Sequence, residues 1–195
     1  MEFWQQGDVI GDWNMWRFTS VLAVAVSVLV GIRAGAQEAQ EATPTSPELQ
    51  VLEKWVGTWD EVMTNKPTEW LPTAGTSTTV NTRAWAIGGN SVRGEGQWEP
   101  AKTKYLHLMT YDPAVGKYRS WYFDSANSIP REIVTGTWDE TTATMTWEGV
   151  DENGIRTKGT HRIVDEDHQE WSVTATSRAG VVLMDLSGKC TRRKE

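Results

Sequence analysis

The 195-residue chain has few of the residues on which most recognisable catalytic and metal sites are built. It contains one cysteine, Cys190, and three histidines, so a disulfide framework and a cysteine-rich zinc or iron–sulfur site are excluded. A histidine metal site would need His107, His161 and His168 on one face of neighbouring strands, and the position of His168 just after an acidic turn disfavours it. The sequence also lacks G-x-S-x-G, H-E-x-x-H and P-loop patterns. We therefore predict no catalytic residues and no metal site.

Positive charge is also scarce. The chain has 19 basic and 26 acidic side chains, for a formal net charge of −7, and a nucleic-acid partner would need a dense Lys/Arg face. Nucleic acid is therefore excluded as a partner. Hydrophobic residues make up 38% and charged residues 23%, a composition typical of a folded core. The length favours one domain.

One long apolar run stands near the N-terminus. Residues 18–32 carry no charge, Arg17 precedes them, and the small-residue triplet Ala34-Gly35-Ala36 follows. The run has 15 residues, fewer than the roughly 20 that span a bilayer. A charged start, an apolar middle and a small-residue exit are typical of a secretory signal. We predict that residues 1–36 are removed and that the protein is exported, periplasmic or secreted, with no stable membrane span after cleavage; an uncleaved anchor is the alternative.

The segment before this run is less typical of a signal, because it carries the acidic side chains Glu2, Asp8 and Asp12. A start at Met15 would remove them, so Met15 is our hypothesis for the true initiator. Residues 37–45 are polar and lack aromatic side chains, which predicts a disordered leader. The folded domain is then predicted over residues 46–195.

A short helix is predicted at the start of this domain. Ser46 is suited to cap it and Pro47 to occupy its first position, while Gly57 is suited to follow its end. One apolar stripe recurs at helical spacing, formed by Leu49, Leu52, Trp55 and Val56.

From Thr58 onward the sequence alternates between strand-forming residues and turn residues. About ten strands are predicted, at residues 57–64, 78–88, 91–99, 104–112, 116–124, 131–138, 142–150, 155–165, 168–177 and 181–192. No helix lies between them, so parallel crossovers are disfavoured. The pattern favours an all-β fold, an antiparallel up-and-down β-barrel, with a two-sheet sandwich as its rival. Closure into a barrel would remove exposed strand edges.

Tryptophan is abundant, with twelve in the chain. Full burial of one indole contributes about 4–6 kcal/mol at roughly 25 cal/mol per Å², so most of these rings are expected to fill the core. Some rings are expected to line a cavity instead, and the best candidates in the central hairpins are Trp85, Trp98, Tyr105 and Trp121. Gly94 and Gly96 share a face with Trp98, which predicts unfilled volume or a bend there.

A short helix followed by Gly57-Thr58-Trp59 and a long antiparallel meander resembles the calycin superfamily. In that superfamily the Trp lies at the closed end of the barrel and a basic residue of the last strand covers it. The resemblance implies this role for Trp59, with Lys189, Arg192 or Arg193 as the cover through a cation–π contact.

More closely, the chain resembles an uncharacterised bacterial family of lipocalin-like domains that opens with a GTWD motif. The segments that carry this resemblance are GTWDEVMT (57–64), RAWAIGGNSVRGE (83–95), YDPAVGKYRSWYFDS (111–125), GTWDETTATMTWEG (136–149) and RIVDEDHQEW (162–171). The family implies the barrel fold and no activity. Tyr105 and His107 stand where small residues are expected, which implies a narrower cavity.

Two carboxylates, Glu61 and Glu95, lie in the middle of predicted strands. Either one would orient a ligand if it faced inward and paired with Arg83 or Arg93, and either would be solvated if it faced outward. His107 shares its register with Tyr105 and other aromatic residues, so it is the candidate axial ligand if the barrel holds haem.

The leading hypothesis is therefore non-catalytic binding of a small apolar or amphipathic molecule in the barrel. The candidate lining is Glu61, Arg83, Trp85, Trp98, Tyr105, His107 and Trp121. Haem or another cofactor is the second hypothesis, and a barrel enzyme that uses Glu61 or Glu95 is the third. A protein-interaction module, which would need a large exposed apolar patch, is the fourth. The inward face of residues 104–124 stays open, because both faces are apolar.

Overall fold

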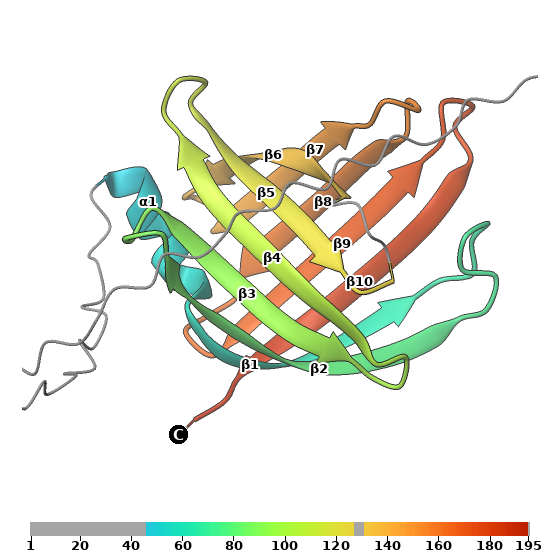
Figure 1. Ribbon diagram of the computed structural model, residues 1–195, viewed down its shortest axis with the longest axis horizontal. Coiled ribbons are helices and arrows are strands. Elements are labelled where there is room, and N and C mark those ends of the chain that lie inside the picture. Colours follow the sequence, from blue (N-terminus) through green and yellow to red (C-terminus); the bar gives the residue numbers. More distant parts are fainter. Residues whose placement is uncertain (1–45, 127–130, 195) are drawn as a thin grey trace, which may run out of the picture. The chain divides into compact units, whose positions relative to one another are not determined.

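The computed structural model describes residues 46–126 and 131–194 (Figure 1). The predicted signal (1–36), the Met15 start and the predicted leader (37–45) lie outside the described residues. The helical segments are α1 (Pro47–Val51) and a 3₁₀ turn (Leu52–Trp55). The strands are β1 (Gly57–Asn65), β2 (Gly75–Ala86), β3 (Ser91–Trp98), β4 (Thr103–Asp112), β5 (Lys117–Asp124), β6 (Arg131–Asp139), β7 (Thr144–Val150), β8 (Arg156–Ile163), β9 (His168–Thr176) and β10 (Val182–Arg192).

The predicted short helix is confirmed. The Ser46 hydroxyl accepts a hydrogen bond from the Leu49 N–H at 3.2 Å, and Pro47 occupies the first turn, where its missing N–H costs nothing. Gly57 follows with φ of +129°, a conformation that side chains with a Cβ rarely adopt. Neither helical segment in the described part of the chain has the length of a membrane-spanning helix.

The ten strands form a closed antiparallel barrel, which confirms the predicted fold class. Each strand pairs with the next one in the chain, and β1 closes the ring by pairing with β10. That last pairing runs from Trp59 opposite Arg192 to Asn65 opposite Leu186. Closure rules out the two-sheet sandwich, since no strand of the ring is left as an edge.

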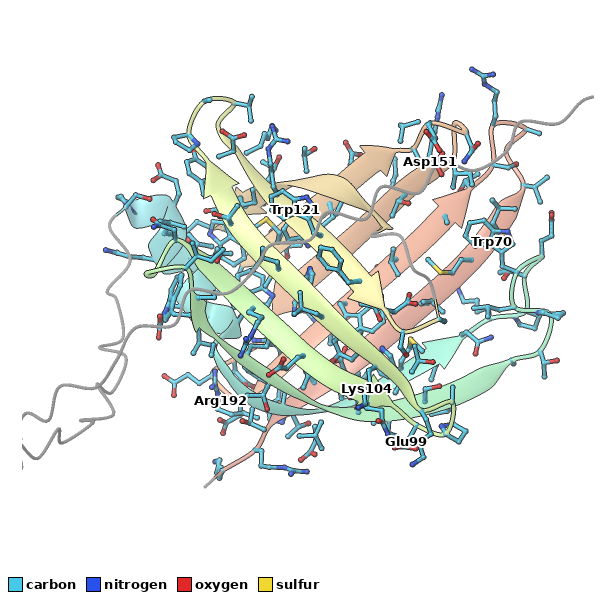
Figure 2. The ribbon with its side chains drawn as sticks, in the orientation of Figure 1. Trp70, Glu99, Lys104, Trp121, Asp151 and Arg192 are labelled. Atoms are coloured by element: carbon cyan, nitrogen blue, oxygen red, sulfur yellow. The ribbon has the colours of Figure 1, made fainter. Side chains whose placement is uncertain are left out.

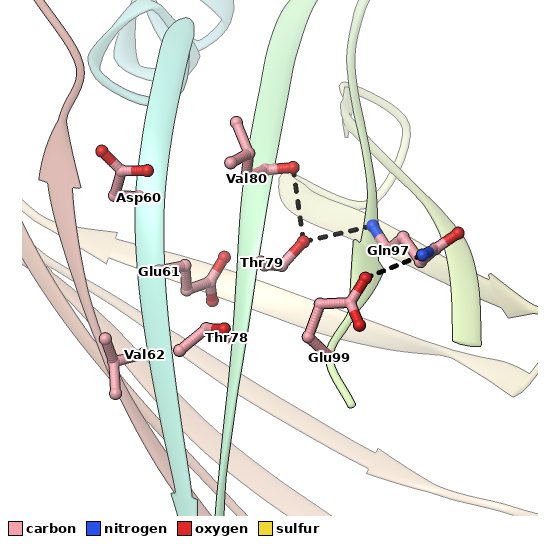
Figure 3. Close-up of a pocket in the computed structure, with 8 residues that line it drawn as sticks. All are labelled: Asp60, Glu61, Val62, Thr78, Thr79, Val80, Gln97 and Glu99. Atoms are coloured by element: carbon pink, nitrogen blue, oxygen red, sulfur yellow. Dashed lines mark hydrogen bonds between the residues drawn. The ribbon is translucent and has the colours of Figure 1, made fainter. Parts of the chain in front are cut away.

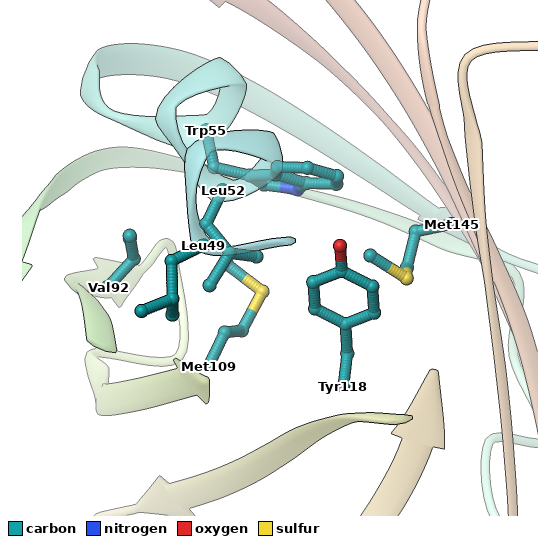
Figure 4. Close-up of a cluster of buried hydrophobic side chains, with 7 residues drawn as sticks. All are labelled: Leu49, Leu52, Trp55, Val92, Met109, Tyr118 and Met145. Atoms are coloured by element: carbon teal, nitrogen blue, oxygen red, sulfur yellow. The ribbon is translucent and has the colours of Figure 1, made fainter. Parts of the chain in front are cut away.

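Helix α1 and its 3₁₀ turn lie at one end of the barrel (Figure 1) and plug it. Leu52 and Trp55 are 0% and 1% exposed, and Val92 and Met145 are each fully buried against this segment. The cluster that fills this end, which we call the filled half, is Leu49, Leu52, Trp55, Val92, Met109, Tyr118 and Met145 (Figure 4). The Tyr118 hydroxyl donates to the Glu48 carbonyl at 2.9 Å, which ties β5 to the helix.

The other end of the barrel, which we call the open half, has no such plug among the described residues. Its large inward side chains are only partly buried, although strand alternation and register direct them to the interior. They are Met63, Trp98, Tyr122, Trp171, Val173 and Leu186. The interior is therefore packed at the helix end and less tightly covered at the opposite end.

Candidate functional site

A polar layer crosses the barrel interior between the two halves, and Glu61 is its acidic member. Glu61 lies on β1 and is 5% exposed. Its carboxylate accepts hydrogen bonds from the Trp171 indole N–H and from Asn81 Nδ2, the latter at 3.1 Å. Arg83 Nη2 lies 3.6 Å from its second oxygen. Glu61 is therefore an inward carboxylate held by two hydrogen-bond donors and one ion-pair partner.

Arg83 is the basic member, and it joins four distant parts of the chain. Its Nη1 donates to Gln169 Oε1 at 2.7 Å, and its Nη2 lies 3.6 Å from Cys190 Sγ. Gln169 in turn donates from Nε2 to the Lys54 carbonyl of the helical plug at 2.8 Å. A buried ion pair is retained only when such additional bonds satisfy its remaining donors, and this network supplies them.

Two histidines face the same layer, and burial keeps both neutral. Burial, reinforced by the charge of Arg83, lowers the pKa of His107 to about 4 and that of His161 to about 3. Because Gln169 Oε1 accepts from Arg83, the His161 Nε2 at 2.9 Å must carry the proton and donate to it. The His107 Nε2 is bonded to the Ser120 hydroxyl. An axial bond from either Nε2 to haem iron would therefore have to replace an existing hydrogen bond.

Cys190 belongs to the layer but is chemically protected. It is 1% exposed, and burial, with the nearby Glu61 charge, raises the pKa of its thiol to about 12. Since the thiolate is the reactive form, Cys190 acts as a small buried side chain.

Two polar atoms at the border between this layer and the open half have no hydrogen-bond partner among the described residues, Asn81 Oδ1 and the Tyr105 hydroxyl. The orientation of the Asn81 amide is fixed, because a carboxylate only accepts and Nδ2 must therefore face Glu61. The Thr79 hydroxyl beside Tyr105 accepts from the Gln97 N–H and donates to the Val80 carbonyl, which leaves it one acceptor lone pair and no proton for Tyr105. Burial, with the nearby Glu61 charge, raises the pKa of Tyr105, so this phenol stays protonated.

Three stacked rings cover this border. Tyr105 stacks on Trp98 and on Tyr122, with ring centroids 5.5 Å and 5.6 Å apart. The Trp98 indole N–H donates to the Tyr122 hydroxyl at 3.3 Å. Tyr105 is 7% exposed, whereas Trp98 and Tyr122 are only partly buried. The two outer rings therefore form the aromatic floor that the open half presents.

The structure brings six of the seven candidate lining residues to the interior. Glu61, Arg83, Tyr105 and His107 lie in or beside the polar layer, and Trp98 lies in the open half. Trp85 also faces inward but lies at the helix end, where its indole N–H donates to Glu53 at 2.6 Å. These residues are thus divided among the polar layer and the two halves.

Trp121 lies on the outer face of the barrel (Figure 2). Its neighbours Ser120 and Tyr122 point inward, so strand alternation turns Trp121 outward, opposite Leu108. The adjacent outward pair is Leu106 opposite Phe123, and Phe123 is 36% exposed. Trp121 therefore contributes to an outer apolar strip on β4 and β5 and not to the interior.

The two candidate carboxylates, Glu61 and Glu95, also lie on opposite faces of the barrel wall. Glu95 faces solvent, 51% exposed, and pairs with Arg93 at 3.4 Å on the outer face of β3. Of the two, only Glu61 meets the requirement of an inward carboxylate.

Inward glycines do not leave the empty volume that the sequence predicts for Gly94 and Gly96. A Cβ at Gly94 would lie 3.2 Å from Asn81 Oδ1, and one at Gly96 would lie 2.9 Å from the Tyr105 hydroxyl. Gly188 makes the same kind of room for the Trp171 ring, which it faces across β9 and β10. The space that each glycine leaves is filled by side chains of neighbouring strands. Large polar and aromatic groups therefore occupy the interior at these positions.

A groove of about 410 Å³ opens in the wall beside this site (Figure 3). It is lined from β1 to β3, by Asp60, Glu61, Val62, Thr78, Thr79, Val80, Gln97 and Glu99. The Thr79 hydroxyl bridges the Gln97 N–H and the Val80 carbonyl, so a side chain replaces a direct backbone bond between β2 and β3. Asp60 and Glu99 at its rim are paired with Arg193 and Lys102.

Sequence reasoning did not find Asn81, Gln169 or Trp171 as members of the site. A signal was present on β2, where Thr79, Asn81 and Arg83 alternate with small or apolar residues. Such alternation is ordinarily interpreted as a polar face toward water, whereas here the polar row faces inward. Gln169 and Trp171 are identified only through their contacts with Arg83 and Glu61.

Trp59 has the signature role that the calycin resemblance implies. It is 0% exposed, its indole N–H donates to the Trp55 carbonyl at 2.9 Å, and the Arg192 guanidinium lies 4.2 Å from the ring centroid. Arg192 Nη1 also donates to the Val56 carbonyl at 2.8 Å. Of the three candidate basic residues, Arg192 is the cover.

Solved structures with the same fold are distant in sequence. The S-type phycobiliprotein lyase CPES from Guillardia theta is 13% identical, with a TM-score of 0.52 over 75% of this chain and 92% of that chain. Rv2717c from M. tuberculosis is 16% identical, with a TM-score of 0.56 over 76% of this chain and 99% of that one. These likenesses show a shared β-barrel fold.

Among curated proteins none matches the sequence. A family profile does match, over residues 44–192, which include every strand of the barrel and both members of the Trp59–Arg192 contact. The chain therefore belongs to the family described as "Protein of unknown function (DUF1579)".

Proposed function

We propose that this protein binds a small amphipathic molecule in the open half of its barrel, without acting on it chemically. The observation that carries the proposal is the change in burial along the interior. The seven side chains of the filled half's cluster are at most 7% exposed, whereas Trp98, Tyr122, Trp171 and Leu186 toward the other end are only partly buried. Interior apolar surface that stays accessible is the ordinary lining of a ligand site.

The chemistry of this lining matches an apolar body that ends in a polar group. Large apolar side chains surround the open half, and the polar layer with Glu61 and Arg83 lies at its base. A ligand that covers one partly exposed indole gains about 25 cal/mol for each Å² of apolar surface removed from water. The polar layer orients the other end of the molecule.

The comparisons support this proposal at the level of fold. The lyase CPES has the same barrel architecture, so this fold serves at least one protein with a role beyond structure. Its activity is not carried over to this chain, because the identity is 13% and fold alone does not imply function.

A fluorescence titration with the neutral probe 1-aminoanthracene tests the proposal. Leu186 points into the open half, whereas its neighbour Ser187 is exposed on the outside. Leu186→Trp should fill the site and abolish the rise in probe emission, and Ser187→Trp should leave it unchanged, as in the wild type. Equal emission with both variants, or no binding to the wild type, would contradict the proposal.

We also propose that the protein is exported by cleavage after Ala36. The support is the uncharged run at 18–32 with Arg17 before it and Ala34-Gly35-Ala36 after it. The test is the intact mass of the protein from the periplasm of a bacterial host that expresses the full chain. Gln37 should be the first residue, and Ala36→Arg should block processing. An unprocessed wild-type chain in the cytosol would contradict the proposal.

A further inference from the structure

The two unpartnered atoms beside the polar layer define which polar group a ligand must carry. Asn81 Oδ1 can only accept a hydrogen bond, and the Tyr105 hydroxyl can donate one. Each is in the interior on a residue more than nine-tenths buried, with exposures of 5% and 7%. A buried polar group without a partner is costly, so a ligand that satisfies both atoms gains affinity that a purely apolar ligand lacks.

The charges around these atoms disfavour an anionic group. Glu61 accepts from Asn81 Nδ2, so its carboxylate lies directly behind the amide whose oxygen is unpartnered. The nearby buried cation, Arg83, is already engaged by Glu61, Gln169 and Cys190. A ligand carboxylate would be repelled by the negative charge of Glu61 and by the Asn81 oxygen, and no unengaged cation would lie nearby to offset this repulsion. The low dielectric of the interior increases the free-energy cost of binding such an anion.

The position of the two atoms also fixes how the ligand lies. Tyr105 is stacked between Trp98 and Tyr122, whose rings form the aromatic floor of the open half. A group that reaches the Tyr105 hydroxyl therefore passes these rings, and a flat apolar body attached to it covers their exposed surface.

We propose that the ligand carries a neutral polar group with both a donor and an acceptor, as an aromatic alcohol or amide does: its O–H or N–H donates to Asn81 Oδ1, and its oxygen accepts from the Tyr105 hydroxyl. This inference rests on the proposed function and adds the class of ligand to it. Carboxylates of the same size and shape are excluded from the site. A molecule that can only accept, such as an ether, satisfies Tyr105 and leaves Asn81 without a donor.

Four naphthalenes with one body and different polar groups test the inference by titration calorimetry at neutral pH. 2-Naphthol and 2-naphthamide each offer a donor and an acceptor, 2-methoxynaphthalene offers an acceptor only, and 2-naphthoate is an anion. The first two should bind at least about tenfold more tightly than the last two, since tenfold corresponds to about 1.4 kcal/mol, the scale of one hydrogen bond. Equal affinities, or tightest binding of 2-naphthoate, would overturn the inference and leave the proposed function standing. No binding of any of the four would count against both.

Tyr105→Phe links the preference to the residue. It keeps the stacked ring and removes one unpartnered hydroxyl, so the protein should be at least as stable as the wild type in urea. Its affinity for 2-naphthol should fall about three- to tenfold. Tyr111→Phe, at the helix end against Tyr118, is the matched control and should bind 2-naphthol like the wild type. Unchanged affinity of Tyr105→Phe, or an equal loss in both variants, would overturn the inference.

Discussion

The filled half and the open half are built from the same ten strands, but they differ in what occupies the space between them. At the helix end the segment from Leu49 to Trp55 inserts apolar side chains that the strands alone do not supply. At the opposite end the described residues supply no such insert, and the wide aromatic side chains there keep exposed surface. The difference separates two tasks, because the filled half supplies packing stability and the open half supplies accessible apolar surface.

The polar layer lies between these halves and depends on both. Gln169 connects Arg83 to the carbonyl of Lys54 in the plug, while Trp171 connects Glu61 to the open half. A buried ion pair rarely adds net stability over an apolar pair of the same size. Its position here agrees with a role in orienting a ligand, and the following substitutions test how the halves differ.

Loss of the buried cation should have the largest effect. Arg83→Met leaves Glu61 buried without its charge partner, and we expect the free energy of unfolding to fall by about 3–5 kcal/mol. Arg93→Met removes an exposed arginine of the neighbouring strand and should cost less than about 0.5 kcal/mol. Urea unfolding measures both. Similar values for the two variants would show that the polar layer is not a buried ion-pair site.

A matched pair of leucines compares the two halves directly. Leu52→Ala empties a fully buried position of the plug and should cost about 2–5 kcal/mol. Leu186→Ala removes the same atoms from the open half, where the side chain is only partly buried, and should cost less than about 1.5 kcal/mol. An equal loss at the two positions would mean that the open half is packed as tightly as the filled half.

Acid should destabilise the protein through two inward histidines, His107 and His161. Their folded pKa values, about 4 for His107 and about 3 for His161, lie below the ordinary value of 6.5. The unfolded chain therefore binds more protons as the pH falls below 6.5, and stability that is present above 6.5 is lost toward pH 4.

Each histidine contributes a slope of about 1.4 kcal/mol per pH unit in that window. His107→Gln retains a hydrogen-bonding partner for Ser120 and cannot titrate, so its stability should depend less steeply on pH between 6.5 and 4. Thermal unfolding at a series of pH values measures this slope. Parallel curves for the variant and the wild type would contradict the assignment of His107 as a buried neutral group.

The smallest effect concerns the cover over Trp59. Arg192→Lys keeps the charge but loses the planar guanidinium that both stacks on the indole and donates to Val56, and we expect a loss of about 1 kcal/mol. Arg193→Lys changes an exposed ion pair with Asp60 and should have almost no effect. A larger loss from Arg193→Lys than from Arg192→Lys would reverse the assignment.

The architecture was predictable because it depends on local signals. Turn residues between short strands and the absence of helices between them predict an antiparallel meander, and Ser46 with Pro47 predicts the helix start. The role of Trp59 followed from the resemblance at its motif. The resemblance did not identify Arg192 among the three basic residues, because that choice depends on the register between β1 and β10.

The polar layer was only half predictable for the same reason. Glu61 and Arg83 were candidates from the sequence, but nothing in it places Gln169 against Arg83 before the barrel closes. Trp121 shows the limit of periodicity, since residues 104–124 are apolar on both faces and alternation alone does not choose the inward one. The inward glycines were expected to leave space, and the space is filled by side chains such as Trp171 that only the strand register identifies.

The most direct test of a filled half and a binding open half is the fluorine NMR spectrum of protein labelled with 5-fluorotryptophan and titrated with 2-naphthol. The resonances of Trp98 and Trp171, assigned by single substitutions, should shift with the ligand, while those of Trp55 and Trp59 should stay in place. Shifts at Trp55 and Trp59 with none at Trp98 and Trp171 would contradict the account.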